Sequence, residues 1–169
     1  MESKKAGALV LLAVGWIGFI FYMSSQTAVN SGNISRAVTR LLLKAGEKAG
    51  IVSYQTAHSA SQIIHFDSIT RSVAHISMYF LLACVISIAF RLFGMKSGKS
   101  AAITILVCLA ISILDELNQM NYTGRNDNGL AASGMEDIIK DVIGTAAALA
   151  VFFLIRHFRD SKKNIRHMN

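Results

Sequence analysis

The chain has 169 residues, of which 53% are hydrophobic and only 16% are charged, and its mean hydropathy is +0.45. This length excludes a large multidomain enzyme, and apolar residues gathered in long blocks exclude an ordinary water-soluble globule. The net charge of +7 and the pI of about 9.7 come from basic residues that flank those blocks, so we expect membrane-flanking charge and no nucleic-acid partner.

The first apolar block, residues 6–23, carries no charge and is long enough to cross a hydrocarbon layer about 30 Å thick as a helix. A secretory signal is the alternative, because Lys4 and Lys5 precede the block and small residues follow it. However, the block is longer than the roughly 7 to 15 apolar residues of a signal, and no clear small-x-small cleavage site follows. We therefore expect a retained first span over about residues 6–25.

The long segment after this span begins with a pattern typical of an amphipathic helix. The helix is predicted to start at Ser31 or Asn33 as its N-cap and to end near Gly46 or Gly50. An apolar stripe comprises Ile34, Val38, Leu41, Leu42 and Ala45, and a basic face comprises Arg36, Arg40, Lys44 and Lys48. We expect an interfacial helix whose basic face is either merely solvated or anchors anionic lipid headgroups. Residues 54–70 are polar and show no clear periodicity.

Three further apolar windows predict spans over about residues 73–93, 101–119 and 137–155. The predicted fold is therefore a single all-α membrane domain over residues 1–169, a bundle of four spans with the interfacial helix outside the membrane between spans one and two. Cys84 and Cys108 lie within spans, where cysteine is common as a small hydrophobic residue, and their spacing indicates neither a disulfide nor a metal site.

The distribution of lysine and arginine predicts the orientation of these spans. Short segments on the side of both termini contain Lys4, Lys5, Arg91, Lys96, Lys99, Arg156, Arg159, Lys162, Lys163 and Arg166. Segments rich in lysine and arginine remain in the cytoplasm. We therefore expect a multi-pass protein of the cell membrane with both termini, the turn at residues 94–100 and a basic tail at residues 156–169 in the cytoplasm.

Polar side chains of all four spans fall in one layer in the outer half of the bilayer, counting about 20 residues from each cytoplasmic boundary. In chain order the layer contains Ser24, Ser25, Gln26, Arg71, His75, Tyr79, Asp115, Glu116, Gln119, Asp137, Lys140 and Asp141. Several of them are four residues apart and share a helix face. Ionisable residues at this depth cost free energy unless they are paired or hydrated, which predicts a functional site. Buried ion pairs that fix helix register are the alternative.

The charges of this layer do not balance in the sequence. Asp115, Glu116, Asp137 and Asp141 outnumber Arg71 and Arg125 if Lys140 turns outward to the interface. Such a surplus is relieved by protonating a carboxylate, by protonating His75 or by binding a cation. The first two routes supply an acid and a base at one site, and the third supplies a metal. The sequence identifies no cofactor and no metal ligand set.

These polar elements resemble the VanZ-like family of small bacterial membrane proteins. The matching residues are Ser24, Ser25, Gln26, Arg71, His75, Tyr79, Asp115, Glu116, Gln119, Gly124, Arg125, Asp137 and Gly144. The sequence differs from the family at Asp141, where asparagine is usual, and at Tyr122 and Thr123, where a proline is common before Gly124. The family is named for a member that lowers susceptibility to teicoplanin, a lipid-bearing glycopeptide antibiotic. The resemblance implies action at the outer leaflet near cell-wall precursors, in antibiotic resistance or in a housekeeping envelope role, and implies no particular reaction.

Three functions fit this pattern, and the sequence does not decide whether the protein is an enzyme. The first is an enzyme that acts on a membrane lipid, a lipid-linked envelope precursor or a lipoglycopeptide. The second is a non-catalytic membrane interaction protein that binds such a ligand or a partner protein. The third is a small proton-coupled transporter, which a single copy of four spans disfavours. Catalytic proton transfer is assigned to His75, Asp115, Glu116 and Asp137. Ligand binding is assigned to Arg71, Tyr79, Gln119, Arg125, Gln26 and Asp141.

Overall fold

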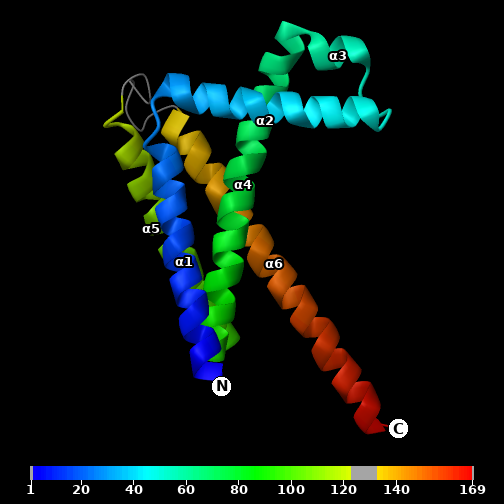
Figure 1. The fold of residues 1–169 in the computed structure, drawn as a ribbon. Coiled ribbons are helices and arrows are strands. Elements are labelled where there is room, and N and C mark those ends of the chain that lie inside the picture. Colours follow the sequence, from blue (N-terminus) through cyan, green and yellow to red (C-terminus); the bar gives the residue numbers. More distant parts are fainter. Residues whose placement is uncertain (1, 123–132, 169) are drawn as a thin grey trace.

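The computed structural model describes residues 2–122 and 133–168, and this part of the chain is helical and contains no strand. Four of its helices are long and apolar enough to cross a membrane: α1 (Glu2–Ser24), α4 (Ala60–Leu92), α5 (Ser97–Gln119) and α6 (Ser133–Met168). They form a bundle, and α2 (Ala28–Lys48) lies across one end of it, with the short α3 (Tyr54–His58) beyond α2 (Figure 1). The predicted all-α fold with four spanning helices is confirmed.

Two of the spanning helices are much longer than the sequence predicted. Helix α4 begins at Ala60 rather than near residue 73, and α6 continues to Met168 through the expected basic tail. Both extensions are polar, so they lack the apolar blocks by which the spans were recognised. Extending an existing helix adds one hydrogen bond for each residue fixed, whereas starting a new one is costly, and the extensions therefore continue the spans.

Helix α2 begins earlier than predicted. Its N-cap is Thr27, whose side-chain oxygen accepts a hydrogen bond from the backbone N–H of Asn30 at 3.3 Å. The two predicted caps, Ser31 and Asn33, therefore lie inside the helix. The predicted C-terminal end is close to the observed one at Lys48.

Both termini lie at the same end of the bundle, opposite α2 (Figure 1). A chain that crosses a membrane four times ends on the side where it began, so this arrangement fits four spanning helices. The turn between α4 and α5 covers residues 93–96 and overlaps the first part of the predicted cytoplasmic turn, whose last residues belong to α5. Gly94 in that turn has a φ of 81°, a conformation that glycine adopts without strain. Assignment of this end to the cytoplasm rests on the basic residues and stays a prediction.

The most extensive helix contact joins α4 and α6. It depends on Gly144, because a Cβ atom at this position would lie 2.2 Å from the carbonyl oxygen of Ile76. Next to this crossing, an apolar core fills the middle of the bundle with buried side chains that include Ile20, Leu82 and Ile111. The close crossing places the polar residues of α4 directly against those of α6.

Candidate functional site

A cavity of about 260 Å³ lies at the α2 end of the bundle. Four spanning helices contribute its walls, and α2 contributes Ser31, Ile34, Ser35 and Val38. One part of the wall is apolar and the other is polar: the apolar part includes Ile20, Met23, Ala74 and Met78, and the polar part includes Ser24, Arg71, His75, Asp115, Gln119, Asp137 and Lys140. The cavity therefore offers two kinds of surface to one ligand.

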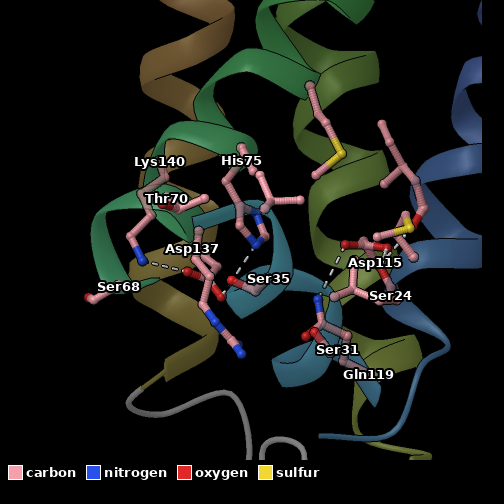
Figure 2. A pocket seen from close by; sticks show the side chains of 17 residues that line it. Ser24, Ser31, Ser35, Ser68, Thr70, His75, Asp115, Gln119, Asp137 and Lys140 are labelled. Carbon is pink, nitrogen blue, oxygen red and sulfur yellow. Dashed lines mark hydrogen bonds and ion pairs between the residues drawn. The ribbon is translucent and has the colours of Figure 1, made fainter. Parts of the chain in front are cut away.

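His75 lies near Asp137 on one side of the cavity (Figure 2). It stands between two carboxylates of α6, those of Asp137 and Asp141. Its Nδ1 lies 3.0 Å from Oδ1 of Asp141, and its Nε2 lies 3.7 Å from Oδ2 of Asp137. Asp141 is buried, and its second oxygen accepts a hydrogen bond of 2.6 Å from the Ser112 hydroxyl of α5. Lys140 forms an ion pair with Asp137 at 2.6 Å. The histidine is thus oriented by a fixed carboxylate while its other nitrogen lies near a second one.

A second polar group lies on the opposite side of the cavity (Figure 2). The hydroxyl of Ser24 at the end of α1 donates a hydrogen bond to Asp115. The side-chain amide of Gln119 donates to Asp115 at 3.3 Å and to Glu116 at 2.9 Å. All four residues are buried.

The two polar groups belong to one cluster. Glu116 is close enough to Asp137, His75 and Asp141 to interact with them electrostatically, and Asp115 is similarly close to Asp141. The structure therefore brings together His75, Asp115, Glu116, Gln119, Asp137 and Asp141, as the shared depth predicted. Tyr79, one helical turn from His75, is fully buried and lies within electrostatic range of Asp141 and Asp115.

Arg71 lies at the cavity wall beneath α2 and has a partner that the sequence analysis did not assign to the site. Its Nε lies 3.3 Å from Oδ2 of Asp67, one turn earlier on α4. Asp67 is buried, accepts a hydrogen bond from Ser35 of α2, and lies 3.3 Å from the hydroxyl of Thr39. Asp67 therefore ties α2 to α4 beside the cavity. Asp67 precedes Arg71 by four residues, the same spacing that relates Arg71, His75 and Tyr79. This spacing would have placed Asp67 in the site if the helix had been predicted to begin at Ala60.

Four other positions singled out in the sequence have different outcomes. The surplus of negative charge assumed that Lys140 turns outward to the interface. In the structure Lys140 instead pairs with Asp137 and lines the cavity. Gln26 is absent from the described cavity lining, and its amide donates to the carbonyl oxygen of Tyr22 at 3.2 Å. Arg125 and Gly124 lie outside the described residues. Within residues 2–122 and 133–168, no three His, Cys, Asp or Glu side chains are arranged to hold a metal ion.

Comparison with known protein families gives a match over most of the chain. A sequence model of the VanZ/LLP1 family matches residues 9–156. The chain belongs to the VanZ/LLP1 family. The match covers every residue of the cavity wall named above, and it confirms the resemblance seen in the sequence. Comparisons with curated proteins and with solved structures give no match.

Proposed function

We propose that this VanZ/LLP1 family member binds the polar headgroup of an amphipathic cell-envelope molecule in the cavity beneath α2. The observation that carries the proposal is the division of the wall into an apolar part and a hydrogen-bonding, charged part at one end of a membrane bundle. Lipid-anchored molecules present these two chemistries together, at the depth where a headgroup meets the acyl region.

The size of the cavity limits what can enter it. About 260 Å³ is slightly below the usual range of small-molecule pockets and accommodates a phosphate or a sugar ring. The remainder of an amphipathic molecule must stay outside, with its acyl part against the exposed apolar side chains of the spans. Arg71 and Lys140 lie at the wall, each paired with a carboxylate, and their remaining N–H groups are the cationic donors proposed for an anionic headgroup.

Two ligand classes fit this description. One is a lipid-linked precursor of the cell envelope, and the other is a lipoglycopeptide such as teicoplanin, the antibiotic that the resemblance to the family suggests. In the second case the protein lowers susceptibility by engaging the lipid-bearing part of the antibiotic at the outer leaflet. The cavity favours the first class, because the phosphate next to the lipid of such a precursor fits its volume.

Proton transfer to a bound ligand is the second candidate function, and the geometry of His75 favours it. A carboxylate that holds one ring nitrogen of a histidine fixes the ring and stabilises its protonated form, as Asp141 is placed to do at 3.0 Å. The other nitrogen lies on the cavity side near Asp137. For this function Asp115, Glu116 and Asp137 complete the set of proton-transfer groups.

A transporter is less well supported by the same spans. Below the polar cluster the described bundle interior is largely apolar. Its polar contacts join neutral groups, such as the Trp16 indole with the Met78 carbonyl oxygen at 3.0 Å and the hydroxyls of Ser87 and Thr104 at 3.2 Å. A proton path to the other face needs ionisable groups or water in this layer.

Substitution of His75 tests the proposed binding site. His75→Gln removes the titratable, fixed ring but keeps a hydrogen-bonding side chain, so we expect the purified variant to fold and to lose at least about tenfold in ligand affinity, as expected for one lost polar contact. Binding is measured in detergent with teicoplanin, with its deacylated form, and with an undecaprenyl-linked sugar phosphate.

The matched control is His65→Gln, the same change on an exposed position of the same helix, which leaves affinity unchanged. Thermal stability is measured on both variants. Equal affinity of wild type and His75→Gln for all three probes overturns the proposal. A loss of affinity that only follows a loss of stability favours a cluster that fixes helix register instead.

A further inference from the structure

A second, strongly basic concavity lies outside the site described above. It is an open groove of about 630 Å³ between α2 on one side and α3 with the start of α4 on the other. Its wall contains the cationic side chains Arg36, Arg40 and Lys44, together with His58, Ala57, Ala60, Ile63 and Ile64. We refer to it as the basic groove.

The cations of the basic groove are poorly neutralised within the described residues. The guanidinium of Arg36 donates to the neutral side-chain oxygen of Asn33 at 2.9 Å. His58 of the groove wall lies 3.3 Å from the carboxylate of Glu47. Arg40 and Lys44 are exposed and have no ion pair to a described residue.

A second observation concerns Gly32, where two guanidinium groups meet. A Cβ atom at Gly32 would lie 3.1 Å from Nη1 of Arg36 and 3.4 Å from Nη2 of Arg71. Asp67 neutralises Arg71, and Arg36 adds a further positive charge beside that pair. Like charges held this close repel each other, and an anion near Arg36 relieves the repulsion.

The orientation of α2 shows which kind of anion is within reach. Leu41 and Leu42 are 69% and 57% exposed. By helical periodicity Leu42 lies on the opposite side of α2 from Arg40 and Lys44, and Leu41 lies on the flank between them. Helix α2 lies across the end of the bundle and its C-terminal part extends beyond it (Figure 1). With its leucines in the acyl region, the helix holds its basic face at the level of the lipid phosphates.

We propose that the basic groove binds the phosphate group of an anionic phospholipid of the surrounding leaflet. Arg36, Arg40 and Lys44 contact the phosphate, and Ile63 and Ile64 contact the adjoining glycerol and upper acyl segment. This site is separate from the cavity beneath α2, and the proposal does not depend on what the cavity binds.

The test compares binding of phosphatidylglycerol and phosphatidylcholine to the purified full-length protein in detergent by native mass spectrometry. Wild type is expected to prefer phosphatidylglycerol, and Arg40→Gln and Lys44→Gln are each expected to lower that preference about fivefold, the effect of one basic residue at a lipid surface. Lys48→Gln is the matched control, since it removes the same charge from the same helix at an exposed position outside the groove. It is expected to change the preference less than about twofold.

Two results would overturn the proposal. An equal loss with Lys48→Gln and Lys44→Gln would show a diffuse attraction rather than a site, and inorganic phosphate that displaces the lipid at equal concentration would show that no lipid is needed. His75→Gln is expected to keep the lipid preference of wild type. This variant tests whether the basic groove and the cavity are separate sites. A loss of the lipid preference in His75→Gln would mean that the two are one site and would overturn the proposal.

Discussion

Asp141 shows at the scale of single residues how a buried charge is accommodated in this bundle. The resemblance to the VanZ-like family implied asparagine at this position, and the sequence contains a carboxylate instead. In the structure, His75 and Ser112 each contact one of its oxygens, at 3.0 and 2.6 Å. The carboxylate is therefore matched by a histidine on the neighbouring helix, which gives the His75 ring a fixed orientation toward the cavity.

Removal of the Ser112 hydroxyl is expected to destabilise the fold. Ser112→Ala takes a hydrogen bond from a buried carboxylate, and an unsatisfied buried group of this kind costs about 1 to 3 kcal/mol. The free energy of unfolding is measured by titration with sodium dodecyl sulfate. Ser77→Ala on the exposed side of α4 is the control and is expected to leave stability unchanged. Equal stability of the two variants would show that Asp141 does not depend on this bond.

At the scale of helices, polar contacts rather than the apolar stripe determine how α2 packs. Its buried residues are Gly32, Thr39 and Leu43, whereas Leu41 and Leu42 of the predicted stripe are exposed. Thr39 contacts the hydroxyl of Thr70 at 3.0 Å as well as Asp67. Buried polar groups on α4 require hydrogen-bond partners, and α2 supplies them, so the helix is rotated to satisfy Asp67.

The crossing of α4 and α6 is expected to fail when Gly144 is enlarged. In Gly144→Ala the new methyl group would lie 2.2 Å from a backbone oxygen of α4, so the helices must separate, at a cost of about 1 to 3 kcal/mol. Because Ile76 follows His75, separation also weakens the contact with Asp141. Unfolding and ligand binding are both measured.

Gly18→Ala is the control for that substitution. Gly18 is a helical glycine, and no atom outside its own helix backbone lies within 4 Å of the place that an alanine methyl group would take. Alanine is therefore expected to be neutral or to stabilise by up to about 1 kcal/mol. If Gly144→Ala is as stable as Gly18→Ala, the close approach of the two helices is not needed for the fold.

At the scale of the whole molecule, the polar chemistry gathers at one end of the bundle and the termini lie at the other (Figure 1). The cavity and the basic groove are both built in part by α2. A protein that acts on lipid-anchored molecules requires such an open end at the membrane surface. The orientation of the bundle therefore determines which leaflet the site serves.

Cysteine labelling tests the predicted orientation. Cys84 and Cys108 are first replaced by alanine, and Ser61→Cys and Lys99→Cys are then made separately at exposed positions near opposite ends of the bundle. With both termini in the cytoplasm, a membrane-impermeant maleimide is expected to label Ser61→Cys in intact cells and Lys99→Cys only after permeabilisation. The reverse pattern would mean that the site faces the cytoplasm.

The sequence by itself determined the four long apolar helices, the amphipathic helix between the first two and most of the polar cluster. The length of an apolar block is a property of one helix alone. The four-residue spacing that puts His75 and Tyr79 on one helix face is also local. Depth in the bilayer follows from the same counting. Counting residues from the boundary of each span correctly placed Asp115, Glu116 and Asp137 in one group without knowledge of the packing.

Only the tertiary structure decided which of these groups become partners. The pairing of His75 with Asp141, the ion pair of Lys140 and the role of Asp67 all depend on how closely neighbouring helices approach and how each is rotated. These quantities arise from contacts between residues far apart in the chain, such as Gly144 against Ile76. A periodic pattern specifies a helix face, but the partner of that face is fixed by packing in three dimensions.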